Sequence, residues 1–340
     1  MPSGADGRFF ATTRTRRRET GDDSVPTPIR EGLSMTYLRP LIPHLACLAL
    51  VLAVVPFAPL ASTNAAAQLL LFVPVVLIPA WRTGRMSYVD IGWPLGLAVI
   101  GVLTLALGRG EATRVLMIGG IYLAVGLRMG LGAIHLWRKG HLDEELPRYA
   151  YQRIRWERRG IENTRLIMQS EALSQGTANM SFLALPALLI SSNEAGAIHP
   201  LEVLGLGVWI GAFAAESIAD RQKLAFLREA RAKGLRSAVC DVGLWRYTRH
   251  PNYFAEWMVW NALIVMAIPS WIALGDRVHV VLWIAIGLCT VFVARIMYTV
   301  LTLYSGAKPA EFYSVQKRPA YRDYQARTRM FFPARPRESD

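Results

Sequence analysis

Apolar residues along the chain fall in long blocks and not in the alternation typical of half-buried strands. Eight segments are rich in Leu, Val, Ile and Ala: 41–62, 67–81, 91–107, 115–134, 180–192, 201–219, 257–274 and 278–294. Most of them approach the roughly 20 residues that a helix needs to cross a hydrocarbon core of about 30 Å. The pattern predicts an all-α protein, a polytopic helical bundle in a membrane with about seven or eight transmembrane helices.

The first two segments form the weakest part of this pattern. The 41–62 segment contains prolines, and its successor, 67–81, is short. Two complete spans are one interpretation, and a re-entrant pair is the other.

Composition agrees with a membrane protein. Of the 340 residues, 53% are hydrophobic and 19% are charged, whereas soluble domains carry about a quarter charged residues. The three cysteines, Cys47, Cys240 and Cys289, lie far apart with no CxxC motif. They indicate neither a disulfide framework nor a zinc site, and we expect no metal.

The net charge of +13 is concentrated in alternate loops. Lys and Arg gather in 137–165, in 221–250 and in the tail from residue 308. In the loops expected on the other side of the membrane, the only basic residues are Arg109, Arg114 and Arg277. By the positive-inside rule, these basic segments and both termini lie in the cytoplasm, which requires an even number of spans, and eight fits. We therefore expect a multi-pass protein of the cell inner (cytoplasmic) membrane, and the charge requires no nucleic acid partner.

Residues 1–34 are polar, rich in Arg, Thr, Gly and Asp, and contain no hydrophobic stretch of the kind found in signal peptides. This composition predicts a disordered leader, and Met35 is a second candidate for the start of the chain. The expected organisation is a leader (1–34), a transmembrane helical domain (35–307) and a basic cytoplasmic tail (308–340).

Ionisable side chains inside the predicted spans are functional candidates, because each costs roughly 2.5–3.5 kcal/mol at the centre of a membrane helix. Glu216 and Asp220 are four residues apart in the sixth span and so share one helix face, and Lys223 follows on that face at its cytoplasmic end. Both a ligand-binding cluster and an interfacial Glu–Lys pair are consistent with this spacing.

A second polar group lies in "LWRYTRHPNYFAEWMVW", residues 244–260. Pro251 suits the first turn of a helix, which makes His250 the expected N-cap. Asn252 and Glu256 then form a polar stripe that descends into the bilayer. A helix N-terminus that follows Arg249 is a suitable phosphate site, although Arg and His could also anchor the helix among lipid headgroups.

Two further stretches carry polar side chains. "LIMQSEALSQGTANM" brings Gln169, Glu171, Gln175 and Asn179 into the fifth apolar region, which predicts either a helix lining a wet cavity or a partly interfacial helix. The tail interleaves arginines with tyrosines, a mixture that binds nucleotide phosphates or anionic lipid. These tail residues are Arg318, Tyr321, Arg322, Tyr324 and Arg327.

At "GLWRYTRHPNYFAEW" the sequence resembles the steroid 5-alpha-reductase-like family of membrane proteins, in particular its bacterial branch. The similarity runs from about Tyr88 to Pro333 and includes "YVDIGW", "DRQKLAF", "YSGAKPAEF" and "RPAYRDYQARTRMFFP", with a reductase-like core at about 88–307. A looser similarity extends to sterol reductases and to isoprenylcysteine and phospholipid methyltransferases.

The resemblance implies a helical bundle that holds NADPH from the cytoplasmic side with its last helices and its tail. The cofactor contacts that it implies are Asp220, Tyr247, Arg249, Asn252, Tyr253, Glu256, Arg318 and Tyr321. Charge and position add Lys223 and His250. Ala255 stands where these sequences commonly have Gly, and the Gln–Glu segment that polarises the ketone in true steroid reductases has no counterpart that we locate.

Three functions remain open. The first is an NADPH-dependent reductase of a lipophilic enone or isoprenoid, in which Glu171, Tyr253 or Asp90 is the catalytic acid or polarising group. The second is an S-adenosylmethionine-dependent methyltransferase of a lipid or thiol, and the third is a non-catalytic membrane protein. The cations near the expected site favour the phosphorylated cofactor over the positively charged one. The expected partners are a lipophilic small molecule and membrane lipids.

Overall fold

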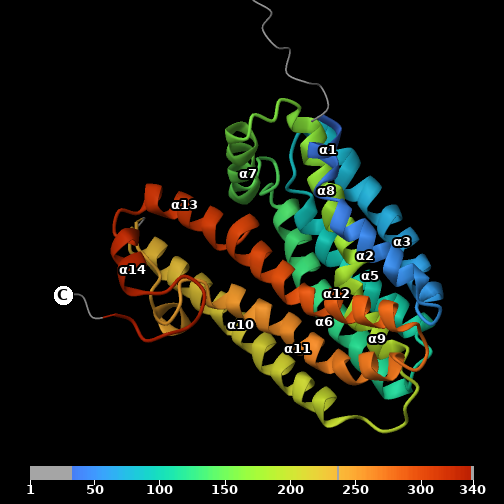
Figure 1. The fold of residues 1–340 in the computed structure, drawn as a ribbon. Helices are drawn as coiled ribbons and strands as arrows, with labels where there is room; N and C mark the ends of the chain where they lie inside the picture. The colour runs from blue at the N-terminus through green and yellow to red at the C-terminus, as the bar shows by residue number, and fades with distance from the viewer. Residues whose placement is uncertain (1–32, 236, 338–340) are drawn as a thin grey trace, which may run out of the picture.

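A computed structural model describes residues 33–235 and 237–337. The predicted leader, 1–34, lies outside the described residues apart from its last two. Every regular element in the described part of the chain is a helix (Figure 1), which confirms the all-α prediction. The elements in chain order are α1 (Leu33–Leu38), α2 (Ile42–Ala53), α3 (Ala58–Phe72), η2 (Val73–Leu77), α4 (Ile78–Thr83), α5 (Val89–Leu107), α6 (Ala112–Arg138), α7 (Pro147–Arg158), α8 (Thr164–Met180), η3 (Phe182–Ala184), α9 (Leu185–Ser191), α10 (Pro200–Ala232), η4 (Gly243–Arg246), α11 (Pro251–Leu274), α12 (Val280–Thr299), η5 (Val300–Tyr304), α13 (Ala307–Lys317) and α14 (Tyr321–Arg327).

Within the described residues, seven helical segments are long and apolar enough to cross a membrane. This agrees with the prediction of a multi-pass bundle of about seven or eight spans. The segments are Ala58–Thr83, Val89–Leu107, Ala112–Arg138, Thr164–Ser191, Pro200–Ala232, Pro251–Leu274 and Val280–Lys317.

The prediction of a single first span over 41–62 is wrong. Helix α2 ends at Ala53, and a new helix begins at Ala58 and continues through η2 and α4 as one long span. Pro56 lies in the break, and a proline disfavours helical conformation at the residue before it. The 12 residues of α2 extend only about 18 Å at 1.5 Å per residue, too short to cross a bilayer alone.

The predicted start of the fifth apolar segment, at residue 180, is wrong. The span begins at Thr164 and is the most buried of the seven. Its polar first half is helix α8, which neighbouring helices surround. The polar side chains are therefore partnered by protein and not by lipid, which is why a search for apolar blocks misses this half.

Two tightly packed helix pairs frame the interior. Helix α5 packs along α6, and α10 packs along α11, whereas α6 and α10 pack very little against each other. Glycines permit the close approach within each pair. A Cβ atom on Gly126 of α6 would lie 2.4 Å from the Ala98 nitrogen of α5, and one on Gly205 of α10 would lie 2.9 Å from the Ala262 oxygen of α11.

The basic segments of the chain gather at one end of the bundle. Helix α13 packs on α7 and α14, and η4 packs on the end of α10, and Figure 1 shows α7, α13 and α14 at the same end. This is the grouping that the alternating loop charge predicted. We refer to it below as the basic end.

Candidate functional site

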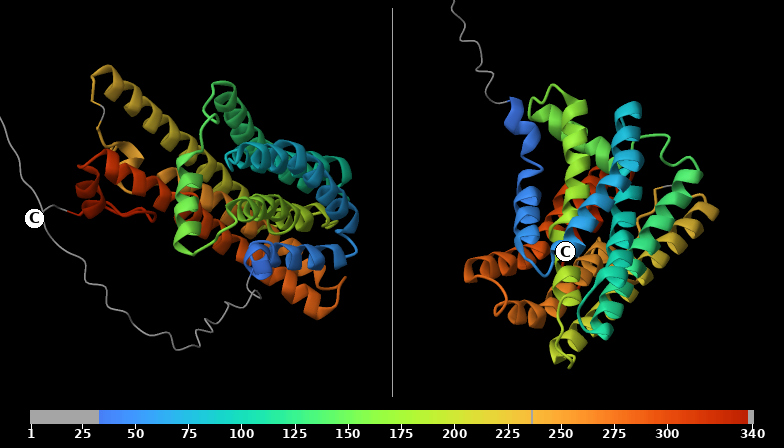
Figure 2. Two further views of the ribbon diagram at one scale, coloured as in Figure 1. Left: turned by 90° about the horizontal axis from the view of Figure 1, so that it is seen from above. Right: turned by 90° about the vertical axis from the view of Figure 1, so that its right-hand side faces the viewer.

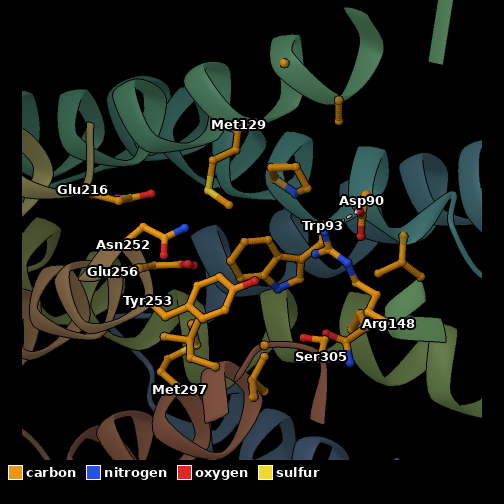
Figure 3. Close-up of a pocket in the computed structure, with 18 of the residues that line it drawn as sticks. Asp90, Trp93, Met129, Arg148, Glu216, Asn252, Tyr253, Glu256, Met297 and Ser305 are labelled. Atoms are coloured by element: carbon orange, nitrogen blue, oxygen red, sulfur yellow. Dashed lines mark ion pairs between the residues drawn. The ribbon is translucent and has the colours of Figure 1, made fainter. Parts of the chain in front are cut away.

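A cavity of about 540 Å³ lies between the α5–α6 pair and the α10–α11 pair (Figure 3). Helix α7 and the segment from α12 to η5 complete its wall. Its polar and aromatic lining residues are Asp90, Trp93, Arg128, Arg148, Tyr149, Gln175, Glu216, Asp220, Asn252, Tyr253, Glu256 and Ser305. The volume is within the range of pockets that bind small molecules and cofactors.

One end of this cavity is dominated by carboxylates. Figure 3 shows Glu216, Asn252 and Glu256 grouped there. Arg128 of α6 forms a hydrogen-bonded ion pair with Glu216, and its guanidinium lies 3.6 Å from Asp220. A single guanidinium therefore faces three carboxylates, so this end is negative if all three are ionised.

Asn252 at this end has an incompletely satisfied side chain. Its Nδ2 donates a hydrogen bond to Asp220 Oδ1 at 3.1 Å. Its Oδ1 is buried and has no hydrogen-bond partner among the described residues. A buried acceptor without a donor costs about 1–3 kcal/mol, and a ligand in the cavity with an N–H or O–H group could supply that donor.

The opposite end of the cavity contains an Asp–Arg–Tyr group. Tyr149 donates a hydrogen bond to Asp90 Oδ1 at 2.6 Å, and Arg148 lies 3.6 Å from Asp90 Oδ2. Burial raises the pKa of Tyr149, and the Asp90 carboxylate raises it further, so the phenol stays protonated as a donor. Asp90 also raises the pKa of Arg148, which keeps a fixed cation at this end.

Trp93 and Tyr253 point into the middle of the cavity between the two polar ends (Figure 3). The Tyr253 ring stacks on His250 with ring centroids 5.2 Å apart and an interplanar angle of 4°. This contact fixes the phenol ring, so its hydroxyl is held in a defined direction.

A second cavity, of about 280 Å³, adjoins the first. Arg148, Tyr253 and Ser305 line both cavities, and Lys317 and Arg318 line only the second. The two hollows therefore adjoin at these three residues, with an acidic chamber inside the bundle and a basic chamber at the basic end.

The structure brings several of the predicted site residues together. Asp220, Asn252, Tyr253 and Glu256, expected to contact a cofactor, line the first cavity, as does Asp90, a predicted catalytic candidate. Arg318 lines the adjoining basic chamber. Helix α11 begins at Pro251 with His250 at the N-cap position, as expected, although the His250 side chain makes no capping hydrogen bond.

Three predicted cofactor residues lie behind the cavity wall in a buried network. Arg249 forms two hydrogen bonds with Glu311, at 2.7 and 3.0 Å, and bonds to the carbonyl oxygens of Gln325 and Thr328. His250 Nε2 lies 3.0 Å from Glu311 Oε1, and Tyr321 is buried. None of the three lines either cavity, and the contacts indicate that Arg249 attaches the tail to the start of α11.

Three other predicted residues also lie away from the cavity. Glu171 is buried and accepts hydrogen bonds from Gln152, Trp156 and Tyr304, a placement that does not support its expected catalytic role. Lys223 lies over the ring of Trp245, with its Nζ 4.0 Å from the ring centroid, so it does not form the Glu–Lys pair considered from the sequence. Tyr247 is exposed at the basic end.

Arg128 and Arg148 are the site residues that the sequence analysis missed. Arg128 lies inside the predicted span 115–134, where any ionisable residue is a functional candidate, so that signal was available. Arg148 belongs to a basic loop, where the positive-inside rule alone accounts for its charge. Among the described residues, no group of three or more His, Cys, Asp or Glu side chains is suited to hold a metal ion.

A family model described as "Protein of unknown function (DUF1295)" matches residues 76–328, about three quarters of the chain. The chain belongs to this family. The matched region contains every residue that lines the two cavities and omits α1, α2 and α3. No curated protein and no solved structure matches the chain significantly.

Proposed function

We propose that this DUF1295 protein is a membrane-embedded NADPH-dependent reductase of a lipophilic enone, with a steroid- or isoprenoid-like substrate. The observation that carries the proposal is that an acidic chamber and a basic chamber adjoin at Arg148, Tyr253 and Ser305. NADPH likewise has two unlike parts, because it joins an uncharged nicotinamide riboside to a polyanionic phosphate group. An acidic chamber beside a basic chamber matches these two parts.

The residues in the two chambers fit that division. Arg148, Lys317 and Arg318 supply three cations in the basic chamber, and guanidinium groups bind phosphates through paired hydrogen bonds. The acidic chamber offers carboxylates that accept hydrogen bonds from ribose hydroxyls. The unpartnered Oδ1 of Asn252 is an acceptor of the kind that a carboxamide N–H would satisfy.

The resemblance to the steroid 5-alpha-reductase-like family supports the same assignment. Of the residues to which that resemblance assigns cofactor contact, Asp220, Asn252, Tyr253 and Glu256 line the first cavity. They come from two helices, α10 and α11, and meet in one chamber.

NADPH, when bound, supplies the hydride of the reaction, since the cofactor carries the difficult chemistry. The contribution of the chain is binding, orientation and polarisation. The Tyr253 hydroxyl, held by ring stacking on His250, is our first candidate for the group that donates a hydrogen bond to a substrate carbonyl. The hydrogen-bonded pair of Tyr149 and Asp90 is a second candidate, because its phenol stays protonated.

By the positive-inside rule the basic end faces the cytoplasm. NADPH would then reach the basic chamber from the cytoplasm, and the protein would reside in the cytoplasmic membrane. The lipophilic substrate would occupy the chamber inside the bundle.

One observation favours a methyltransferase instead. Four carboxylates, Asp90, Glu216, Asp220 and Glu256, line the first cavity, against the two guanidinium groups of Arg128 and Arg148. S-adenosylmethionine carries a net positive charge, and an acidic chamber would attract it. A methyltransferase that uses this cofactor is therefore the second candidate.

Cofactor titration separates the two functions. Detergent-purified protein would be titrated with NADPH and, separately, with S-adenosylmethionine, and the quenching of tryptophan fluorescence would be followed, since Trp93 lies in the cavity. Saturable binding of NADPH alone, followed by NADPH consumption with a lipophilic enone, is the expected result. Binding of S-adenosylmethionine alone would establish the second candidate, and binding of neither would indicate a non-catalytic protein.

A further inference from the structure

We propose that the cavity opens sideways into the bilayer between α6 and α10, and that an uncharged lipophilic molecule enters there with Arg128 as the gating side chain. We call this gap, lined by Met129, Gly132, Ala133 and Leu136 on α6 and by Glu216 and Asp220 on α10, the lateral opening. The inference rests on the proposed function only in treating that molecule as the substrate.

The first observation is the packing of the helices. Each of α6 and α10 is sealed against its own partner, α5 or α11, but they hardly pack against each other. Seen from above, their ends at the basic side stand apart (Figure 2, left). The cavity occupies this gap, because residues of both helices line it. Because α6 and α10 make few contacts with each other although both line the cavity, we infer that the gap between them faces the surroundings of the bundle.

The second observation is the surface of α6 at the gap. Gly132 lines the cavity and is exposed, and a Cβ atom placed on it would meet no described heavy atom within 4 Å. Leu136, one turn further, lines the cavity and is 47% exposed. The inner wall of the cavity therefore continues without interruption onto the outer surface of the helix.

The third observation is the level of the gap in the membrane. Half-exposed Trp137 follows the rim directly, and Arg138 and Lys139 come next. Tryptophan is enriched at the membrane–water interface and basic residues lie just beyond it. Gly132 and Met129 are one to two turns deeper, so the lateral opening lies in the leaflet at the basic end, close to the headgroups.

Arg128 reaches across this gap. Its guanidinium pairs with Glu216 and lies near Asp220 on α10, and it also covers the ring of Phe213 at 4.9 Å. Its Nε is buried and has no hydrogen-bond partner within residues 33–235 and 237–337. Arg128 thus spans the gap, and moving it aside needs no change in the backbone but breaks its ion pair with Glu216.

The charges behind the rim select the molecule that enters. Glu216, Asp220 and Glu256 line the cavity behind the gap and disfavour an anionic head, such as that of a fatty acid or a phosphatidylglycerol. The apolar rim of Met129, Ala133 and Leu136 favours a hydrocarbon body. The carboxylates thus exclude an anionic head, and the uncharged head, an alcohol or a ketone, follows from treating the molecule as the substrate of the proposed reductase.

The test labels a cysteine placed inside the gap. Met129→Cys would be introduced into the full chain carrying Cys47→Ala, Cys240→Ala and Cys289→Ala, and reconstituted in vesicles. A long-chain N-alkyl maleimide reaches the thiol from the bilayer, and a sulfonated, impermeant maleimide reaches it from water. We expect Gly132→Trp to slow labelling by the long-chain reagent about tenfold, which corresponds to about 1.4 kcal/mol of added barrier.

Gly120→Trp is the matched control. Gly120 lies on the same helix, is exposed and also has open space around its Cβ position, but it does not line the cavity. Labelling in this variant should equal that of the parent. Gly132→Leu, a smaller change, should slow labelling too and serves if the tryptophan variant does not fold. If both Gly132 variants react with the long-chain reagent as fast as the parent, the lateral opening is wrong.

Two separate measurements keep the two proposals apart. NADPH titration of the unsubstituted chain tests the reductase, and labelling of the cysteine variants tests the lateral opening without any cofactor. Slowed labelling together with no NADPH binding would retain the lateral opening and reject the reductase. Unchanged labelling together with normal NADPH binding would reject the lateral opening and retain the reductase.

Discussion

Asn252 donates a hydrogen bond to Asp220 at 3.1 Å, while its own side-chain oxygen is buried without a partner in the described part of the chain. The first contact fixes the orientation of the amide, and the second atom is a buried acceptor without a donor in the described residues. Asn252 lies one turn from Glu256 on α11, and both side chains face the same cavity. This arrangement makes the two residues direct tests of the proposed cofactor site.

Replacing Asn252 should weaken NADPH binding without harming the fold. In Asn252→Ala the loss expected for a buried polar partner is about 1–3 kcal/mol of binding free energy, measured by fluorescence titration. Asn261→Ala is the control, because Asn261 lies on the same helix but bonds to the carbonyl oxygen of Trp257 and does not line the cavity. Equal affinities of the two variants would count against the proposed site.

Glu256 should behave in the same way. Glu256→Ala removes a hydrogen-bond acceptor from the acidic chamber. The free energy of NADPH binding should become less favourable by about 1–3 kcal/mol, and the yield of folded protein should be unchanged. Glu229→Ala, at an exposed site on α10, controls for the loss of a carboxylate. If Glu256→Ala instead lowers the yield while the surviving protein binds NADPH normally, the polar stripe on α11 has a structural role.

Glu171 should be important for stability and not for the cofactor. Its carboxylate accepts hydrogen bonds from Gln152, Trp156 and Tyr304 in the interior. Glu171→Gln replaces one acceptor oxygen with an N–H₂ group, which should cost about 1–3 kcal/mol of stability, seen as a lower thermal unfolding midpoint in detergent. NADPH affinity should equal that of the parent. Loss of reductase activity at full stability would restore Glu171 as a catalytic candidate.

The sequence is most informative where the pattern of residues within a single helix determines its structure. Spans of apolar residues and the four-residue spacing of Asn252 and Glu256 follow from 3.6 residues per turn, so local sequence is enough to predict both. The break at Pro56 is partly indicated by the proline itself. The exact point where α2 ends depends on its packing against α3 and α8, which local sequence does not contain.

The remaining site residues depend on contacts between distant parts of the chain. Glu171 looks like an expensive carboxylate in a span, but Tyr304, 133 positions away, is one of its partners. Arg249 looks like a phosphate ligand beside a helix N-terminus, yet it pairs with Glu311. Arg148 enters the cavity only because α7 folds over the bundle. Such pairings are decided by tertiary structure and leave no periodic signal.

Arg249→Ala should unfold the basic end. Removing one partner of a buried ion pair leaves the other charge uncompensated, which costs about 3–5 kcal/mol, and Glu311 would be that charge. The expected result is a large fall in the thermal unfolding midpoint and proteolysis of the tail. Lys233→Ala, which breaks the exposed pair with Glu229, should leave the midpoint unchanged. A stable Arg249→Ala variant with weakened NADPH binding would instead support the phosphate contact predicted from the sequence.

His250 should make stability dependent on pH below neutrality. Burial lowers the pKa of His250, against the opposing effect of Glu311, while Lys223 and Arg249 lower it further. As pH falls below about 6.5, the ordinary value for histidine, the unfolded chain takes up a proton that the folded protein resists, so stability is fully present above that pH and declines below it. Unfolding midpoints between pH 7 and pH 5 should therefore fall less steeply in His250→Gln than in the parent, and exposed His141→Gln should follow the parent. Parallel curves for all three proteins would mean that His250 stays accessible to protons in the folded state.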